Sequence, residues 1–304
     1  MSGLAEIWAY PFMVNAFRAG TVVAVLAAVM GWFMVLRRQS FAGHSLAMVS
    51  FPGAAGATLL GISATFGYFA FCVGAALVIA VLPRSGQDGQ DGQGAALTGT
   101  VQAFLLACGY LFVALYKGFL GGVNSLLFGS FLGITGAQVV TLAVVAVVGL
   151  GVLALIGRPL LFASVDPDAA AGRGVPVRAL SAAFLVLLGL ATAGASQITG
   201  SLLVFALLVL PAATAQQLTA RPVLSLTVSV LLALVVTWGG LVAAYYSPYP
   251  IGFFVTTFAF AVHVAARLVR TVGGARPART VRLRGARLAR TMTVRGTRTV
   301  RGTR

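Results

Sequence analysis

Apolar runs of about 20 residues recur along the whole chain and limit its possible folds more than any other feature. An α-helix rises 1.5 Å per residue, so a run of about 20 residues crosses the ~30 Å hydrocarbon core of a bilayer. Of the 304 residues, 59% are hydrophobic and only 9% are charged, whereas about a quarter of the residues of a soluble domain are charged. The strands of a membrane β-barrel would instead give alternating segments of about ten residues. The sequence therefore predicts an all-α, polytopic membrane protein.

About nine of these runs are long enough to be membrane spans. Their predicted ranges are 12–36, 45–62, 64–82, 97–116, 137–157, 178–195, 199–215, 223–246 and 250–270. The first run is too long for the apolar core of a signal peptide, and no basic residue precedes it. We therefore expect it to be retained as the first span.

The arginines predict how the chain is oriented. Nine spans place the two termini on opposite sides of the membrane, and basic residues concentrate in cytoplasmic loops. With the C-terminus inside, seven arginines lie in inner loops and twelve more lie from Arg267 onward. The seven are Arg37, Arg38, Arg84, Arg158, Arg173, Arg178 and Arg221. Only Arg18 and Lys117 then lie outside, so we predict an N-out, C-in topology.

Residues 1–270 form the predicted transmembrane domain, which one polar segment interrupts and another follows. Residues 84–94 (RSGQDGQDGQG) have nothing to bury and predict a flexible inner loop. Residues 271–304 predict a basic, low-complexity, disordered cytoplasmic tail, either held against anionic lipid headgroups or without a specific role. The tail lacks the aromatic residues and the surrounding fold typical of nucleic-acid binding, so no nucleic-acid partner is expected.

The acidic and lysine residues exclude two kinds of energy coupling within the chain. Proton-coupled carriers depend on carboxylates inside the membrane, and none of the five acidic residues falls in a predicted span. A P-loop is also missing, because the only lysine, Lys117, stands in LYKGFLGG rather than in G-x-x-x-x-G-K-[ST]. We therefore expect no enzymatic activity in this chain. If ATP drives it, a separate subunit must hydrolyse the ATP.

The segment SVDPDAAAGRGVPVRAL (164–180) places two of the five acidic residues in one inner loop, predicted at residues 158–178. Its first residues predict a helix start: an aspartate at the N-cap, a proline at the first helical position and an aspartate at the positive end of the dipole. Alanines favour the helix, and a glycine can close it in a left-handed turn. The element comprises Asp166, Pro167, Asp168, Ala169, Ala170, Ala171, Gly172, Arg173 and Gly174, with Gly172 or Gly174 closing it. We interpret it as a docking helix for a cytoplasmic partner, with a plain surface helix as the alternative.

This segment and four others resemble the permease subunit of ABC-type zinc/manganese importers. The four are FAGHSLAMVSFPGAAGATLLG (41–61), LLFGSFLGIT (126–135), QITGSLLVFALLVLPAATAQQL (197–218) and SPYPIGFFVTTFAFAVHVAARL (247–268). They occur in the same order as in that family, and the resemblance extends over residues 12–270. The joint match is specific, although no single segment would be.

The resemblance implies the fold of the vitamin B12 and siderophore permeases, a homodimer, and a place in the cell membrane of a prokaryote. It implies two cytoplasmic ATP-binding subunits and an extracytoplasmic metal-binding protein as partners. ATP would be bound by the partner, and this chain would hold no cofactor of its own. Residues 158–178 would form the coupling loop, whose helix enters a cleft on the ATP-binding subunit. The cargo would be a divalent metal ion, Zn²⁺ first and Mn²⁺ next, moved inward by alternating access.

Two positions depart from the family pattern. The family usually has an aspartate, and a histidine four residues later, shortly before Leu-Pro-Gly, but this chain has His44 and Met48 there. An imidazole and a thioether can bind borderline or soft metals, although two ligands do not make a site. The alternative is a histidine at the inner membrane interface and a methionine in the core. His263, deep in the last span, is a further candidate contact for the ion or a structural histidine.

Prolines inside two predicted spans mark candidate breaks. Pro52, followed by Gly53, and Pro211, followed by Thr214, each remove a backbone hydrogen bond and should kink or divide a helix. The freed carbonyls and nearby hydroxyls would line a pathway, or the prolines would only shape packing. Uncharged polar residues in or near the spans are expected to bond between helices. These are Asn15, Gln102, Asn124 and Gln197.

A stand-alone secondary carrier or exporter of a small metabolite is the alternative to an importer subunit. The lack of acids in the predicted spans and the preformed helix in the inner loop both favour the importer subunit.

Overall fold

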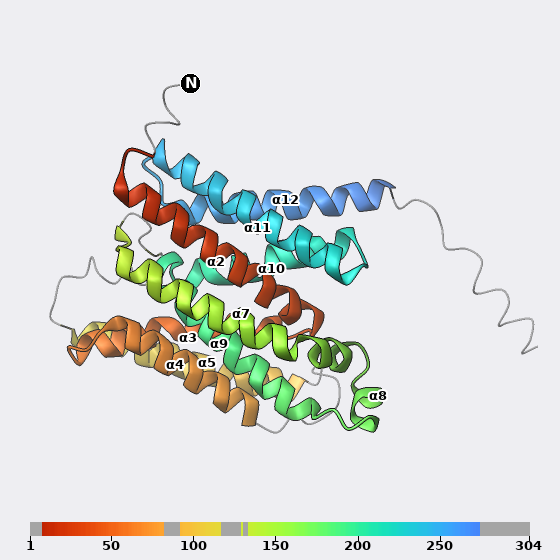
Figure 1. The fold of residues 1–304 in the computed structure, drawn as a ribbon. Helices are drawn as coiled ribbons and strands as arrows, with labels where there is room; N and C mark the ends of the chain where they lie inside the picture. The colour runs from red at the N-terminus through yellow and green to blue at the C-terminus, as the bar shows by residue number, and fades with distance from the viewer. Residues whose placement is uncertain (1–7, 82–91, 117–128, 130–132, 274–304) are drawn as a thin grey trace, which may run out of the picture.

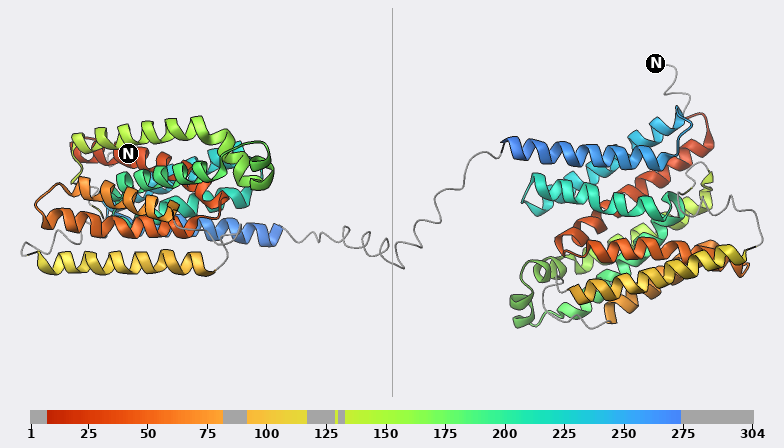
Figure 2. Two further views of the ribbon diagram at one scale, coloured as in Figure 1. Left: turned by 90° about the horizontal axis from the view of Figure 1, so that it is seen from below. Right: turned by 180° about the vertical axis from the view of Figure 1, so that it is seen from behind.

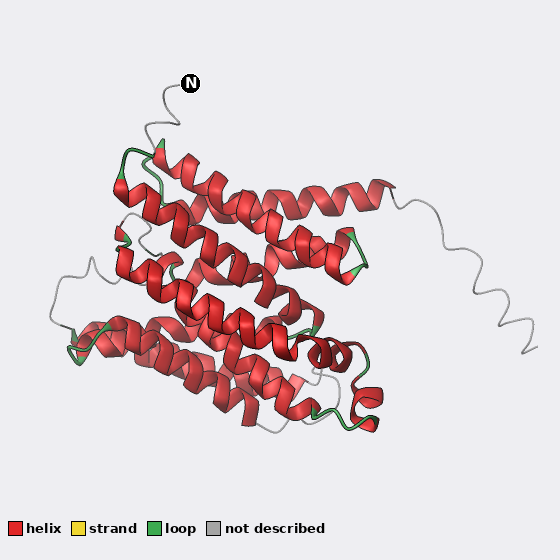
Figure 3. Cartoon of the chain, viewed as in Figure 1, coloured by secondary structure: helices red, strands yellow, loops and turns green. Residues whose placement is uncertain are grey.

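The computed structural model describes residues 8–81, 92–116, 129 and 133–273 (Figure 1). Within these residues every regular element is a helix, which confirms the all-α prediction (Figure 3). The helices are α2 (Pro11–Leu36), α3 (Ser40–Leu59), α4 (Ala64–Val81), α5 (Gly92–Leu115), α7 (Gly136–Val165), α8 (Pro167–Gly172), α9 (Val177–Thr199), α10 (Ser201–Leu218), α11 (Pro222–Tyr245) and α12 (Ile251–Gly273). Some predicted features lie outside the described residues. These are most of the inner loop 84–94, the tail beyond residue 273, and Asn124.

The long helices coincide with the predicted spans. Seven of those described are long and apolar enough to cross a membrane: α2, α4, α5, α7, α9, α11 and α12. In α10 the apolar stretch is shorter, at Leu203–Leu218, and α3 mixes serine, histidine, glycine and proline with its apolar residues. A polytopic membrane protein is therefore confirmed, whereas nine crossings and the N-out, C-in direction stay predictions.

Two helices form the centre of the bundle. α2 and α9 are the most deeply buried of the seven long apolar helices, and α2 packs against α7, α9, α10 and α11. α5 is the most exposed and lies at the margin of the bundle, where it packs on α3 (Figure 2). Small residues allow α2 to approach its neighbours closely. A Cβ atom on Gly31 of α2 would lie 1.9 Å from the carbonyl oxygen of Leu208 on α10.

The two ends of the bundle differ in chemistry. One end of the bundle contains the C-terminal ends of α2 and α12, the α7–α8–α9 segment and the α10–α11 turn (Figure 1). This end carries arginines, among them Arg37 at the C-cap of α2 and Arg221 at the N-cap of α11. At the other end the Tyr10 and Tyr245 rings lie 6.4 Å apart. Tyrosines favour both membrane interfaces, whereas arginines favour the cytoplasmic side, and the predicted orientation places the arginine-rich end there.

Prolines do not divide the helices. α3 continues through Pro52, and α10 continues through Pro211. α7 likewise continues through Pro159 to Val165, so the inner loop predicted to begin at residue 158 is shorter than the sequence suggested. Neighbouring helices hold these segments in helical conformation although each proline lacks an amide donor.

Candidate functional site

α8 begins as the sequence predicts. The Asp166 carboxylate accepts a hydrogen bond from the Ala169 amide at 2.9 Å, and Pro167 is the first residue of the helix. Asp168 lies in the first turn, where a carboxylate complements the positive end of the helix dipole. The start of this helix is therefore fixed by its own side chains.

The end of α8 is a Schellman motif. The Gly174 amide donates to the Ala171 carbonyl at 2.9 Å, and the Val175 amide donates to the Ala170 carbonyl at 3.0 Å. Gly174 has a φ of +79°, a left-handed conformation that glycine adopts without steric cost. Of the two glycines that the sequence offered, Gly174 and not Gly172 closes the helix.

Most of α8 projects from the arginine-rich end of the bundle (Figure 1). Ala170 is fully buried, and α8 packs on α7 and α9. The guanidinium carbon of Arg173 lies 5.4 Å from the centre of the Phe162 ring on α7. The surface carrying Asp168, Ala169 and Ala171 is exposed. A short, rigid and exposed helix of this kind can fill a cleft on another protein.

A second candidate site pairs α10 with α12. Thr214 Oγ lies 2.6 Å from the Leu210 carbonyl oxygen and 2.9 Å from His263 Nδ1. A hydroxyl has one proton, so if it donates to the carbonyl, Nδ1 must carry the proton that the threonine oxygen accepts. In a neutral imidazole this leaves the lone pair on Nε2, which is the form that binds metal ions. The structure therefore joins two residues that the sequence selected for separate reasons.

His44 lies beside α10 at a different place. Its ring meets the Phe205 ring edge to face, with the ring centres 4.8 Å apart. Its Nδ1 atom is buried without a hydrogen-bond partner among the described residues. Met48 follows one turn later in α3 and is half-buried.

The two histidines do not form one site. Phe205 and Thr214, which they contact, are nine residues apart in α10. This spacing corresponds to about 13 Å along the helix and about half a turn around it. His44 and His263 therefore lie on opposite sides of α10. Among the described residues, no three His, Cys, Asp or Glu side chains are close enough to hold a metal ion.

Pro52 and Pro211 were both predicted from the sequence to be helix breaks, but they have different neighbours in the structure. A Cβ atom on Gly53 would lie 2.4 Å from the Gly67 carbonyl oxygen of α4, and one on Gly109 of α5 would lie 2.8 Å from the Pro52 ring. Pro52 and Gly53 therefore lie at close helix crossings. Pro211 is buried in α10, one turn before Thr214 and its contact with His263.

Two of the four uncharged polar residues, Gln102 and Gln197, bond between helices as expected, whereas Asn15 bonds to a residue just before α7. Asn15 donates to the Ile134 carbonyl at 3.4 Å, and the side-chain oxygen Oε1 of Gln102 accepts from Ser45 Oγ at 2.8 Å. Gln197 accepts from Thr65 at 3.1 Å. The contacts of Gln102 and Gln197 serve helix packing, which confirms that interpretation for these two residues.

Sequence reasoning missed the importance of Arg37. It counted this residue only as one of the inner arginines, but the side chain is half-buried and its Nη1 donates to Ser164 Oγ on α7 at 2.9 Å. Its neighbour Arg38 is exposed. No local pattern distinguishes two consecutive arginines at a helix end, so only the packing identifies the one that points inward.

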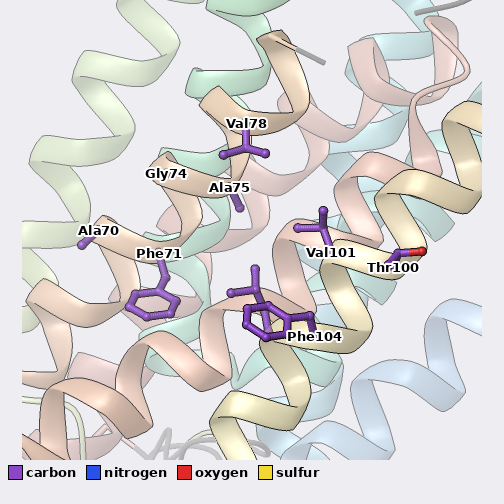
Figure 4. Close-up of a pocket in the computed structure, with 9 residues that line it drawn as sticks. Ala70, Phe71, Gly74, Ala75, Val78, Thr100, Val101 and Phe104 are labelled. Atoms are coloured by element: carbon purple, nitrogen blue, oxygen red, sulfur yellow. The ribbon is translucent and has the colours of Figure 1, made fainter. Parts of the chain in front are cut away.

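A groove of about 640 Å³ between α4 and α5 offers no site for an ion (Figure 4). Phe71, Val78, Val101 and Phe104 line it, and among the described lining residues only Thr100 has a polar side chain. Apolar walls suit hydrocarbon rather than a metal ion. The candidate positions for an ion are therefore the polar ones beside α10.

The profile of the ABC 3 transport family matches residues 9–270. The manganese transport system membrane protein MntC of Listeria monocytogenes is 28% identical over 216 residues, covering 71% of this chain and 75% of that protein. The chelated iron transport system membrane protein YfeC of Yersinia pestis is 31% identical over 218 residues, covering 72% of each protein.

The fold also resembles that of a solved structure, PsaBC from Streptococcus pneumoniae in complex with Fab. The TM-score is 0.76 at 24% identity, and the match covers 86% of this chain and 95% of that chain. At this identity the similarity concerns the fold alone.

Proposed function

The chain belongs to the ABC 3 transport family, and from that premise we propose that it is the membrane permease subunit of an importer that carries a divalent metal ion, Zn²⁺ before Mn²⁺. It is a multi-pass protein of the bacterial cell membrane. An importer permease works with an ATP-binding subunit and a substrate-binding protein. We also propose that two copies of the chain form the permease and that ions cross it by alternating access.

α8 is the observation that carries the coupling role. It is capped at both ends and exposes most of its surface at the arginine-rich end. A helix whose shape is fixed before docking can transmit force without first folding. An exposed ion pair would contribute only about 0–1 kcal/mol, so the shape of α8 matters more than its charge. In this proposal the ATP-binding subunit holds α8 and moves it during ATP hydrolysis.

The ligand types along the helices favour Zn²⁺. None of the five acidic residues of the chain lies in the described long helices, whereas His44 and His263 do. Imidazole suits Zn²⁺, and carboxylate oxygens suit Mn²⁺. The names of MntC and YfeC point instead to manganese and chelated iron for those relatives. A pathway with few strong ligands releases its ion quickly, so high affinity belongs on the external binding protein.

Reconstitution tests the importer function directly. The chain is sealed into proteoliposomes with and without its ATP-binding subunit, and uptake of radiolabelled Zn²⁺ and Mn²⁺ is followed. We expect uptake only with the subunit and ATP, and faster uptake of Zn²⁺. Uptake by the chain alone would instead support the stand-alone carrier.

Ala170→Pro tests the coupling role of α8. The Ala170 amide donates to the Asp166 carbonyl at 3.1 Å, and proline removes that donor and breaks the helix. We expect normal expression and membrane insertion but no ATP-driven uptake. Ala220→Pro, in the turn between α10 and α11, is the control because Ala220 lies outside any helix. Normal uptake by Ala170→Pro would disprove the coupling role.

The double variant His44→Asp/Met48→His tests the choice of ion. It restores the acidic residue and the histidine usual in the family and so adds a carboxylate beside α10. We expect uptake to shift from Zn²⁺ toward Mn²⁺ in a competition assay. An unchanged ratio of the two ions would show that these positions do not select the cargo.

A further inference from the structure

We propose that Arg37 is the positioning residue that carries a displacement of α8 into the core of the permease. This inference rests on the proposed function, because it assumes that an ATP-binding subunit moves α8. Arg37 touches neither the ion nor the partner in this proposal. It acts through the helices that it connects.

One guanidinium joins both helices that hold α8. Arg37, at the C-cap of α2, donates from Nη1 to Ser164 on α7 at 2.9 Å and from Nη2 to Ser181 on α9. Its guanidinium carbon also lies 5.7 Å from the centre of the Phe184 ring on α9. Ser164 stands two residues before the N-cap Asp166, and Ser181 lies in the second turn of α9. A movement of α8 therefore pulls on both partners of Arg37.

The backbone turn after α2 fixes the direction of Arg37. The Arg38 amide donates to the Val35 carbonyl at 3.0 Å, and the Gln39 amide donates to the Met34 carbonyl at 2.9 Å. These bonds form a Schellman motif in which Arg38 has a φ of +55°, where glycine is usual. A non-glycine residue is retained in this strained conformation only where its surroundings impose it. The turn sends Arg37 inward and leaves Arg38 exposed.

The last turns of α2 connect Arg37 with the other half of the molecule. Trp32 donates from Nε1 to Ser225 on α11 at 2.9 Å, and its carbonyl accepts from Gln216 on α10 at 2.8 Å. Gln216 stands two residues after Thr214, which contacts His263. Polar contacts thus tie the base of α8 to the end of α2, and others tie the last turns of α2 to α10, two residues from the α10–α12 contact.

The planar guanidinium suits this role better than any other side chain. Its fork can donate to acceptors on two separate helices at once, whereas a lysine presents a single ammonium group. Neither serine is charged, so the contacts fix distance and direction without trapping an ion pair. Arg37 therefore converts movement of α7 and α9 into movement of α2.

The test compares Arg37→Gln with Arg38→Gln in the permease reconstituted with its ATP-binding subunit. Three quantities are measured: binding of that subunit, the rate of ATP hydrolysis, and Zn²⁺ uptake. For Arg37→Gln we expect unchanged binding and at least about fivefold less Zn²⁺ carried per ATP hydrolysed, the lower range of a coupling between sites. For Arg38→Gln this ratio should equal that of the wild type. A purely structural loss would lower the amount of active protein without changing the ratio.

An unchanged ratio in Arg37→Gln, an equal loss in Arg38→Gln, or loss of subunit binding would each overturn the proposal. If Arg37→Gln fails to fold, the double variant Ser164→Ala/Ser181→Ala removes both acceptors while keeping the arginine, and the same uncoupling is expected. Full coupling in that variant would equally overturn it. Failure of the importer function is distinct, because it would show in the wild type as uptake that needs no ATP-binding subunit.

Discussion

α3 around Pro52 and α10 around Pro211 carry the same sequence signal in different surroundings. Close helix approaches surround Pro52, because Gly53 lies against Gly67 of α4 and Gly109 of α5 lies against Pro52 itself. Pro211 stands one turn before a threonine that contacts a histidine of another helix. A proline that frees a carbonyl creates a polar site only where neighbouring helices also offer polar side chains. The sequence of one helix cannot show which side chains those are.

Gly67→Ala should have the largest effect and should act on folding. Its Cβ atom would lie 2.1 Å from the Gly53 carbonyl oxygen, so α4 must move away from α3. Overpacking of this kind costs about 3 kcal/mol, and we expect a clear fall in the thermal unfolding midpoint in detergent. Gly74→Ala in the same helix meets nothing within 4 Å and should leave the midpoint unchanged or slightly raised. Equal midpoints for both variants would contradict the packing role of the Pro52 region.

Thr214→Val should act on transport rather than on folding. It removes the hydroxyl that contacts His263, and a loss of about 1.4 kcal/mol would lower Zn²⁺ uptake about tenfold. Thr192→Val is the matched control, because Thr192 donates to the Leu188 carbonyl at 2.7 Å in the same backbone pattern. The measurement is Zn²⁺ uptake per folded protein, which should be lower in Thr214→Val than in Thr192→Val. If Thr192→Val lowered uptake as much, the contact with His263 would not be the cause.

Pro211→Ala and Pro52→Ala should differ by a smaller amount. Either alanine supplies an amide that the proline lacks and can close the helical hydrogen bond. At position 211 this stiffens α10 beside the Thr214–His263 contact, and we expect uptake to fall about threefold, the effect of one modest hydrogen bond. At position 52 the surroundings are close-packed, so uptake per folded protein should not change. Equal effects on uptake would remove the distinction between the two helices.

α8 shows what can be predicted from residues that are close together in the sequence. Asp166, Pro167 and the alanines determine a capped helix because their contacts lie within a few residues of each other. The choice of Gly174 over Gly172 depended on where the chain turns back toward α9. Likewise, the length of α7 was underestimated because its continuation through Pro159 depends on packing against other helices.

The candidate site residues show what could not be predicted from the sequence. Sequence reasoning selected Thr214 for its place after a proline and His263 for its depth in an apolar run, with nothing to connect them. It also grouped His44 with His263, although they lie on opposite sides of α10. Arg37 and Arg38 are adjacent in the chain, yet one points inward and the other outward. Such relations depend on contacts between residues far apart in the sequence.

By itself, the sequence determined that this chain is a helical membrane protein, roughly where most of its long helices lie, and that a capped helix follows α7. These properties follow from hydrocarbon burial and from hydrogen bonds within one helix, which act over a few neighbouring residues. Only the tertiary structure decided which proline lies near a polar pair, which arginine joins α2 to the base of α8, and which glycines are in close contact. Those outcomes depend on how separate helices rotate and pack against one another, and no single segment contains that information.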